Sequence, residues 1–451
     1  MRCVLGKDIF YRKYKDEVIL YETENKKVFV LNAFSYEVLN YFKDYIEVET
    51  VVEKLIGKYN LQDSKDNLYE FINSLISKGI LIEEKNLEFE VQNIEHKYYS
   101  KNLESDELTS VLIELTFNCN EKCKHCYCCV DDSKTELNTI EVKYLLKELR
   151  EMGVLDIIFT GGDLFTRTDT FEILNYAYDL GFLITIFTNG IALKDSDLFS
   201  LKSIYPKAVH FSVYSHIPEK HDYITQVNGS YNKTIEIIKK CVLLKIPVNI
   251  KVPVLSTNCN EIDELSKLAI SLGTTIQFGM TISPTNNGGK EPFEFRMQND
   301  EDYYKAFASI NKNLKYKCND SLVSEDSKIC GAGRHSISIN PYGEVYPCNS
   351  LLISCGNIRE KNIKDIWSQS NILKEIRKIT MGNIKGCESC QNKNKCFYCM
   401  GEALLETGDY LSKYDEACRL TKASLYSLER KKQNEYWITK NNYGRYLLSI
   451  K

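Results

Sequence analysis

Several features that would place this chain in a familiar class are scarce or missing. No run of about 18 apolar residues occurs among its 451 residues, so we expect no membrane-spanning segment and no membrane partner. The N-terminus, MRCVLGKDIFYRKYKDE, is too polar for a secretory signal peptide, and a cytoplasmic location is expected. The net charge of −4 gives no reason to expect a nucleic acid as a partner. With only 8 prolines, no long disordered tract is indicated.

Cysteine, by contrast, is abundant and unevenly distributed. The chain holds 17 cysteines, many of them in two dense groups at Cys119–Cys129 and Cys387–Cys399. Disulfides are disfavoured in a reducing compartment. Clustered cysteines in a cytoplasmic chain therefore point to metal binding or redox chemistry.

The first 85 residues are predicted to form a compact unit in which strands precede helices. The predicted strands are Asp8–Tyr14, Glu17–Thr23 and Lys27–Leu31. The predicted helices are Ser35–Phe42, Thr50–Tyr59 and Lys65–Ser77. Gly79 ends the last helix, and Ile80–Ile82 returns as a strand. The charged residues 86–108 are interpreted as a linker.

From Leu112 onward, apolar strand-like runs alternate with helical stretches. The predicted strands are Val111–Leu115, Ile157–Thr160, Ile184–Phe187, Ala208–Val213, Val248–Val252 and Thr275–Phe278. The predicted helices are Ile140–Met152, Asp169–Leu180, Tyr231–Leu244 and Glu261–Leu272. This alternation predicts an α/β fold, a partial (β/α)6 barrel over residues 109–300. The alternation of strands and helices ends at Cys330. Residues 301–451 are predicted to form a Cys-rich domain whose stability depends on metal clusters.

The first cysteine motif follows the first predicted barrel strand. Its three cysteines, at C-x3-C-x2-C spacing, are Cys119, Cys123 and Cys126. Three thiolates on one loop can hold three irons of a [4Fe–4S] cluster and leave the fourth iron open. The alternative is a zinc knuckle, which needs a fourth ligand. The candidates for that ligand are His125, Cys128 and Cys129.

This motif and its position resemble the signature of the radical S-adenosylmethionine (SAM) superfamily, and the resemblance extends over roughly residues 108–300. It implies a cluster whose open iron binds SAM and whose reduction yields a 5′-deoxyadenosyl radical. Two further motifs are similar to those of the family in order and position. Thr188-Asn189-Gly190 stands at the end of the third strand. The run His221–Thr225, together with Gly229–Tyr231 after it, is typical of peptide-modifying members.

The same resemblance implies which residues contact SAM. Gly161-Gly162-Asp163 matches the family's Gly-Gly-Glu, which receives the SAM amino group, although Asp163 is one methylene shorter. Ser212 stands where a strand-four serine contacts SAM. His125 replaces the usual aromatic residue beside the adenine.

The second cysteine set is similar to the SPASM extension, which holds two auxiliary [4Fe–4S] clusters, so that the chain would carry three. By this resemblance the first auxiliary cluster takes Cys330, Cys348 and Cys399. The second takes Cys387, Cys390, Cys396 and Cys418. A zinc ribbon is the alternative, but seven cysteines fit two clusters better than one zinc site.

The first auxiliary cluster is then one protein ligand short. Cys318 or Cys355 can complete it; otherwise its open iron can bind a substrate thiolate. The remaining cysteines are interpreted as ordinary thiols. Cys128 and Cys129 are expected to pack beside the first cluster, and the buried set is Cys3, Cys241 and Cys259.

The N-terminal unit, expected to be a winged-helix-like recognition domain, resembles the peptide chaperone of pyrroloquinoline quinone biosynthesis. That fold is called a RiPP recognition element when it is fused to a maturase of ribosomally synthesised peptides. The resemblance implies that an edge strand, Lys27–Leu31, pairs with the leader of a precursor peptide and faces the helix Leu68–Ile76. A winged-helix DNA-binding domain is the alternative. The strand-first order and the many acidic residues disfavour it.

Together these resemblances imply a maturase that forms thioether cross-links in a Cys-rich ribosomal peptide, as sactipeptide and ranthipeptide synthases do. An electron donor such as flavodoxin or ferredoxin is expected, and no catalytic base is identified. Carbon–carbon cross-linking is one alternative. Oxidation of Cys or Ser, as in anaerobic sulfatase maturation, is another, but Asn349 stands where that group has a basic Asp. A zinc-stapled or electron-transfer protein is the non-enzyme alternative.

Overall fold

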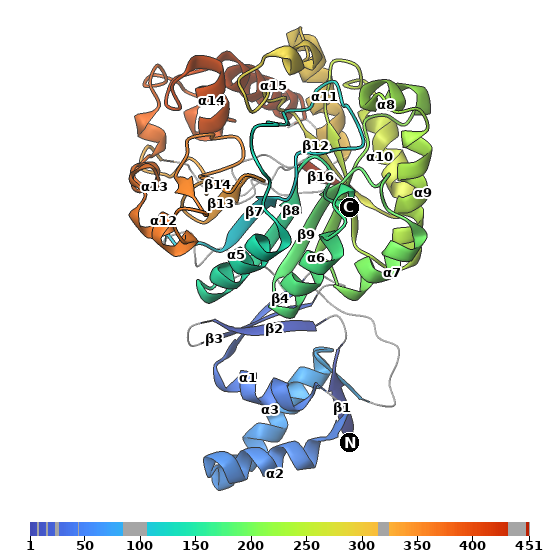
Figure 1. The fold of residues 1–451 in the computed structure, drawn as a ribbon, viewed down its shortest axis with the longest axis vertical. Helices are drawn as coiled ribbons and strands as arrows, with labels where there is room; N and C mark the ends of the chain where they lie inside the picture. Colours follow the sequence, from blue (N-terminus) through green and yellow to red (C-terminus); the bar gives the residue numbers. More distant parts are fainter. Residues whose placement is uncertain are drawn as a thin grey trace. The chain divides into compact units, whose positions relative to one another are not determined.

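The computed structural model describes residues 1–6, 9–14, 17–22, 27–43, 45–83, 106–313, 324–431 and 448–450. They fall into two compact units, Met1–Glu104 and Ser105–Lys451, which are called unit 1 and unit 2 below (Figure 1). Most of the predicted linker, residues 86–108, lies outside the described residues. No helix in the described ranges is long and apolar enough to cross a bilayer.

Unit 1 contains two small antiparallel sheets. One has β3 (Glu17–Glu22) between β2 (Ile9–Tyr14) and β4 (Lys27–Asn32). The other has β1 (Arg2–Leu5) between two short strands, β5 (Ile46–Glu47) and β6 (Leu81–Glu83). Of these three strands the sequence analysis predicted only β6, at Ile80–Ile82. The three strands of the first sheet lie where they were predicted, within a residue or two.

Three helices complete unit 1 at the predicted positions: α1 (Phe34–Tyr41), α2 (Val48–Tyr59) and α3 (Lys65–Ser77), with a short 3-10 turn at Gln62–Ser64. Apolar residues at helical spacing on α3, among them Leu68, Ile72 and Leu75, are buried in the core of this unit. The principal contacts of α3 are with β6 and α2. The helix that principally contacts β4 is α1, not the predicted Leu68–Ile76 helix.

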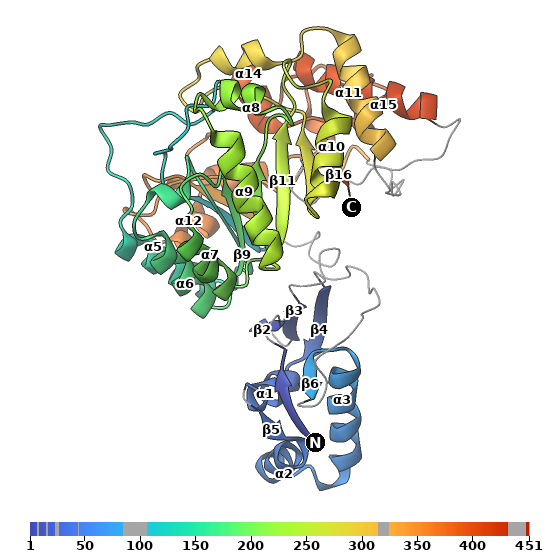
Figure 2. The same ribbon diagram turned by 90° about the vertical axis from the view of Figure 1, so that its right-hand side faces the viewer.

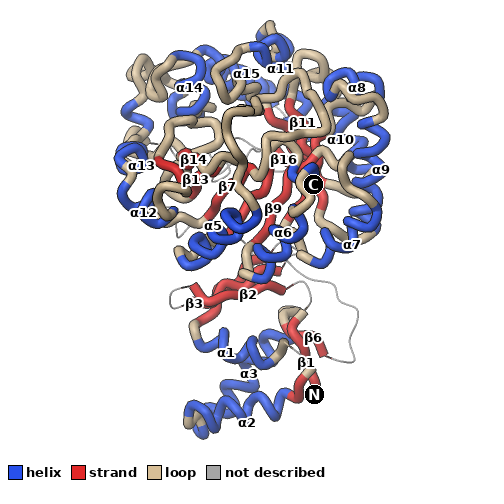
Figure 3. Tube along the Cα trace, in the orientation of Figure 1, coloured by secondary structure: helices blue, strands red, loops and turns tan. Residues whose placement is uncertain are grey.

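Unit 2 is built on six parallel strands that neighbour one another in chain order, as predicted for a partial (β/α)6 barrel (Figures 2 and 3). They are β7 (Ser110–Glu114), β8 (Asp156–Thr160), β9 (Leu183–Thr188), β10 (Ala208–Ser212), β11 (Val248–Pro253) and β12 (Thr275–Gly279). The connecting helices are α5 (Thr139–Glu151), α6 (Thr170–Asp179), α7 (Asp195–Ser203), α8 (Pro218–Thr225), α9 (Ser230–Leu243) and α10 (Ile262–Ser271).

Alternation along the strands separates the outer face from the inner one. On β7, Val111 and Ile113 are fully buried in the main core, whereas Leu112 between them is only partly buried. Helix α5 covers the outer face with apolar residues at positions i, i+3, i+4 and i+7, and it begins at a capping box of Asn138 and Glu141. The inner face is thus left for a ligand at the carboxyl ends of the strands.

The C-terminal part of the chain extends the barrel sheet, which the sequence analysis did not foresee. β13 (Ser336–Ile339) pairs in parallel with β7, and β14 (Glu344–Tyr346) and β15 (Gly356–Asn357) follow in antiparallel order. At the other edge, β16 (Leu448–Ile450) pairs with β12. The helices of this part are α11 (Asp300–Asn313), α12 (Ile363–Gln369), α13 (Asn371–Ile376), α14 (Met400–Thr407) and α15 (Asp415–Lys431).

Because β13 covers the edge of β7, removing residues 314–451 should disrupt the barrel. Ile337 and Ile339 of β13 are buried in the main core, so the truncation would expose both apolar surface and an unpaired strand edge. We expect the truncated chain to be recovered mainly in inclusion bodies, measured as soluble fraction and by size-exclusion chromatography. Removing residues 1–104 instead should leave unit 2 soluble. A soluble, cooperatively melting 1–313 fragment would contradict this account of the sheet.

Candidate active site at the carboxyl end of the barrel

The predicted cluster ligands lie on the loop between β7 and α5, residues 115–138, which is called the cluster loop below. Its first residues run beside the end of β8. Leu115 N–H donates to the Thr160 carbonyl at 2.9 Å, and Gly162 N–H donates back to the Thr116 carbonyl at 2.7 Å. The loop therefore starts in a fixed position at the carboxyl edge of the sheet.

The close approach of these two backbones explains the glycine pair. A Cβ at Gly161 would lie 2.1 Å from the Thr116 carbonyl oxygen, and one at Gly162 would lie 2.3 Å from the Asn118 carbonyl oxygen. Gly161 also has a φ of +142°, which other residues rarely adopt. The pair is thus required by the path of the cluster loop, whatever it does for a ligand.

Asp163 joins the ends of β8 and β9. Its carboxyl group is completely buried, and Oδ2 accepts hydrogen bonds from the Thr188 hydroxyl at 2.7 Å and the Asn189 N–H at 2.8 Å. Oδ1 accepts from the Phe165 N–H at 3.0 Å. Burial raises the pKa of Asp163, against the effect of these donors. Contact between Asp163 and a SAM amino group stays a prediction.

The ends of β9 and β10 also reach the thiols of the cluster loop. Asn189 Nδ2 lies 3.7 Å from Cys119 Sγ and donates to Asn120 Oδ1 at 2.7 Å. The Tyr214 hydroxyl lies 3.5 Å from Cys123 Sγ, and its ring lies 4.9 Å from that of His125. Burial raises the pKa of the Cys119 thiol to about 11.

Cys126 and Cys128 form a pair beside these groups, in line with the prediction that Cys128 packs next to the first site. A hydrogen bond from Cys128 lowers the pKa of Cys126 to about 7. Glu121 is buried and accepts from the Cys123 thiol at 3.3 Å through Oε2, and burial raises its pKa to about 7. Its Oε1, like His125 Nε2, has no hydrogen-bond partner among the described residues.

The run His221–Thr225, which is typical of peptide-modifying members of the family, lies in helix α8 and bonds to the cluster loop. The carbonyls of Ile224 and Thr225, at its end, accept from the N–H groups of Lys124 and Lys122, both at 3.0 Å. The Asp222 carboxylate then accepts from the backbone N–H groups that begin α9, at 2.6 and 2.9 Å. The run therefore holds the middle of the cluster loop.

Ser212 is half-buried at the end of β10, on the inner face of the barrel, and pairs in register with Lys251 of β11. Beside it on this face, the His210 ring stacks on Phe187 with centroids 4.5 Å apart, and Lys251 Nζ lies 5.4 Å from the same Phe187 ring. The inner face thus offers polar and aromatic groups to a ligand.

The four cysteines assigned to the second auxiliary site come together near the surface. Burial raises the pKa of Cys387, and the neighbouring thiols Cys396, Cys418 and Cys390 raise it further. Burial raises the pKa of Cys418 in the same way, and Cys390 again adds to it. Cys390 itself is exposed.

The three segments of the first auxiliary site also meet. Gly333 N–H donates to the Pro347 carbonyl at 3.1 Å, which brings the Cys330 segment against Cys348. A Cβ at Gly401, two residues after Cys399, would lie 2.4 Å from the Ser350 backbone.

The two candidates for the missing ligand differ. Cys355 packs against the main hydrophobic core of unit 2, whereas Cys330 and Cys348 pack against a separate, smaller hydrophobic core. Burial raises the pKa of Cys355 to about 11. Cys318 lies outside the described residues. Of the three thiols predicted to be buried, Cys3 and Cys241 are fully buried, whereas Cys259 is only partly buried.

The thiols at the barrel and the four thiols at Cys387, Cys390, Cys396 and Cys418 are of the donor type that binds iron–sulfur clusters, in which every thiolate binds a different iron. At the first site, three thiols and two unpartnered buried polar atoms, Glu121 Oε1 and His125 Nε2, surround one end of the barrel. Within the described ranges, no three His, Cys, Asp or Glu side chains converge to hold a single metal ion.

Sequence reasoning missed several residues that shape this site. The Tyr127 hydroxyl donates to buried Glu114 at 2.7 Å, and burial raises the pKa of Glu114 to about 7. Glu114 could have been found from strand alternation, because it shares the inner face with Leu112. No sequence signal pointed to Glu121 or Tyr214.

Replacing Gly161 by Ala should destabilise unit 2 and displace the start of the cluster loop. The added methyl group would overlap the Thr116 carbonyl, which we expect to cost about 3 kcal/mol. Gly181→Ala is the matched control, because Gly181 also has a positive φ but no atom within 4 Å of its Cβ position. Thermal unfolding monitored by circular dichroism measures both. Equal shifts in melting temperature would show that backbone strain, not the contact with the cluster loop, requires the glycine.

Comparison with known proteins agrees with this geometry. The model of the radical SAM superfamily matches residues 113–269, and that of the SPASM iron–sulfur cluster-binding domain matches residues 330–396. The AdoMet-dependent heme synthase of Methanosarcina barkeri is 27% identical over 329 residues, which cover 66% of this chain and 93% of that protein. The antilisterial bacteriocin subtilosin biosynthesis protein AlbA of Bacillus subtilis is 26% identical over 354 residues, or 75% of this chain and 76% of AlbA.

Among solved structures, Streptococcus suis SuiB bound to precursor peptide SuiA has the same fold. The TM-score is 0.60 at 18% identity, and the match covers 93% of this chain and 100% of SuiB. The two domain matches, the parallel barrel sheet and the cluster loop at its carboxyl edge lead to one conclusion. The chain contains a radical SAM domain over residues 113–269 and a SPASM iron–sulfur cluster-binding domain over residues 330–396.

Proposed function

We propose that this chain is a peptide maturase that uses radical SAM chemistry to form thioether cross-links in a Cys-rich, ribosomally made precursor. The observation that carries the proposal is the anchored cluster loop, with three thiols at the open end of the barrel and a separate unit ahead of it. The first feature supports radical chemistry on SAM. The second supports a substrate that is recognised away from the site of reaction.

At the barrel, Cys119, Cys123 and Cys126 would hold the first [4Fe–4S] cluster. When bound there and reduced, this cluster supplies the electron that cleaves SAM to a 5′-deoxyadenosyl radical. The residues proposed to hold SAM are His125, Gly161, Gly162, Asp163 and Ser212. Asp163 is well suited to a fixed contact, because hydrogen bonds from the ends of β8 and β9 hold its carboxyl group in place.

The C-terminal cysteines would hold two auxiliary clusters, which makes three in all. The first would take Cys330, Cys348 and Cys399. The second would take Cys387, Cys390, Cys396 and Cys418. Forming a carbon–sulfur bond from a C–H and an S–H removes two hydrogen atoms. One of them would leave the carbon as a hydrogen atom for the 5′-deoxyadenosyl radical, and the other would leave the thiol as a proton and an electron. Auxiliary clusters held by these cysteines would supply an acceptor for that electron.

Residues 1–85, which form most of unit 1, are proposed to bind the leader of the precursor, and residues 86–108 are proposed to be a linker. In the described residues β4 pairs only with β3, so its other edge can accept a peptide strand. Val30 on this strand is 42% exposed. The likeness to SuiB covers so much of this chain that it extends into unit 1, and SuiB was solved with a precursor peptide.

Substrate classes other than a thioether-forming peptide have less support. The heme synthase similarity shows that related cores serve other substrates, but it covers only 66% of this chain. The similarity to AlbA, which is named for a bacteriocin, favours a peptide product. Sulfatase-type oxidation is disfavoured because Asn349, beside Cys348, has no carboxylate to act as a base. A low-potential donor such as flavodoxin or ferredoxin, in the cytoplasm, would supply the electron.

Leader binding should depend on unit 1, whereas SAM cleavage should not. Deleting residues 1–104, or replacing exposed Val30 of β4 by Asp, should weaken binding of a labelled leader peptide at least about tenfold, roughly 1.4 kcal/mol, in fluorescence polarisation. Lys54→Asp on the exposed face of α2 is the control and should bind normally. Full affinity in the deletion variant would assign unit 1 to another partner.

The nature of the bond can be read from the product. We expect the precursor to lose two hydrogen atoms for each link, and the Cys residues in those links to become inert to iodoacetamide, because their sulfur atoms are already bonded to carbon. Mass spectrometry after alkylation measures both changes. A lighter peptide whose cysteines all remain alkylatable would exclude thioethers and favour carbon–carbon cross-linking.

A further inference from the structure

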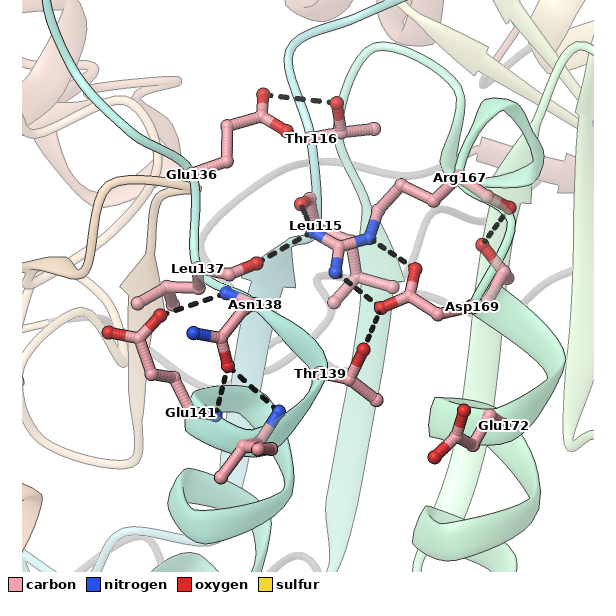
Figure 4. A network of polar contacts seen from close by, with 12 residues as sticks. Leu115, Thr116, Glu136, Leu137, Asn138, Thr139, Glu141, Arg167, Asp169 and Glu172 are labelled. Atoms are coloured by element: carbon pink, nitrogen blue, oxygen red, sulfur yellow. Dashed lines mark hydrogen bonds and ion pairs between the residues drawn. The ribbon is translucent and has the colours of Figure 1, made fainter.

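One arginine bonds to both ends of the cluster loop. Arg167 follows the 3-10 turn Leu164–Thr166 after β8, and its Nη1 donates to the carbonyl of Leu115 at 2.8 Å and to that of Leu137 at 2.9 Å (Figure 4). Leu115 stands where the loop leaves β7, and Leu137 stands just before the start of α5. All three predicted cluster ligands lie between these two points.

The guanidinium group is held in this orientation by a carboxylate. Asp169 accepts from Nε at 2.9 Å and from Nη2 at 2.7 Å, and its Oδ2 also accepts from the Thr139 hydroxyl at 2.6 Å. The Arg167 and Asp169 side chains are only 13% and 17% exposed. A lysine cannot reproduce this planar set of donors, because its ammonium group is a compact point charge.

Two further side chains, Glu136 and Arg359, hold the last residues of the loop, 135–137, in place. The Glu136 carboxylate accepts from the Thr116 hydroxyl at 3.0 Å and from the Phe117 N–H at 2.8 Å, so the two ends of the loop also bond to each other. Arg359, from the SPASM part of the chain, donates to the Thr135 carbonyl at 2.8 Å and the Glu136 carbonyl at 3.2 Å. The two ends of the cluster loop, residues 115–118 and 135–137, are called the neck of the loop below, and these hydrogen bonds hold them in place from both sides.

We propose that Arg167 is a positioning residue for the first cluster: by bonding both ends of the cluster loop it fixes the span across which Cys119, Cys123 and Cys126 present their thiolates. The proposal rests on the assignment of these cysteines to the SAM-binding cluster. Fixing the ends of a long loop removes much of its conformational freedom, and a preorganised ligand set binds its cofactor more tightly.

The test compares Arg167→Gln with a nearby charge change that spares the loop. Glu172→Gln removes an exposed ion pair between α6 and α5, in which Lys143 Nζ lies 2.6 Å from Glu172, and it touches no residue of the cluster loop. Both full-length variants are reconstituted anaerobically, reduced, and examined by electron paramagnetic resonance with and without SAM. The first cluster is recognised as the signal that changes when SAM is added.

We expect Arg167→Gln to lose at least half of the SAM-responsive signal, and the signals that SAM does not affect to stay at wild-type intensity. Arg167→Lys should lie closer to Gln than to wild type, and Glu172→Gln should match wild type. A general loss of stability would instead lower all cluster signals together. A full SAM-responsive signal in folded Arg167→Gln would overturn the proposal.

Hydrogen exchange in the wild-type holoenzyme provides a second measurement if Arg167→Gln does not fold. The backbone N–H groups of Phe117 and Asn118, at the neck of the loop, should exchange at least about tenfold more slowly than those of exposed loop tips such as Ser133. Equal exchange rates would show that the neck is not fixed and would overturn the proposal. Absence of any SAM-responsive signal in the wild type would instead contradict the proposed function itself.

Discussion

The close contact between two backbone segments at the carboxyl edge of the barrel governs the rest of the site. The start of the cluster loop and the turn after β8 approach so closely that no Cβ fits at Gly161 or Gly162. From this contact the loop passes the ends of β9, β10 and α8, which bond to it through Asn189, Tyr214 and the carbonyl of Ile224. The barrel, rather than the loop, thereby determines where the thiols lie.

The SPASM part of the chain is not an appendage to this barrel. Its strand β13 extends the parallel sheet beside β7, the strand from which the cluster loop departs. Its Arg359 bonds to the Thr135 and Glu136 carbonyls and to the Glu141 carboxylate, at the beginning of α5. A shared sheet and a shared set of hydrogen bonds hold both parts of unit 2 in one folded body.

Much of this architecture could be predicted from the sequence because its signals are local. Strand and helix periodicity gave the six barrel strands, and cysteine spacing gave the cluster loop. The pairing of β13 with β7 could not be predicted, because the register between segments more than 200 residues apart leaves no local pattern. The same is true of Arg167, whose partners Leu115 and Leu137 accept through backbone carbonyls that any residue offers. Asp163 matched a family motif, but its complete burial appeared only in the structure.

If Cys119, Cys123 and Cys126 hold the cluster that cleaves SAM and the C-terminal cysteines hold two others, replacing the first three should abolish cleavage and spare the other two clusters. The most direct measurement is iron content and 5′-deoxyadenosine formation after anaerobic reconstitution of wild type and of the variant with all three residues replaced by Ala. We expect about 12 irons and SAM cleavage for the wild type, and about 8 irons and no cleavage for the variant. Cleavage by the variant, or a wild-type plateau near about 4 irons, would contradict this assignment of the cysteines.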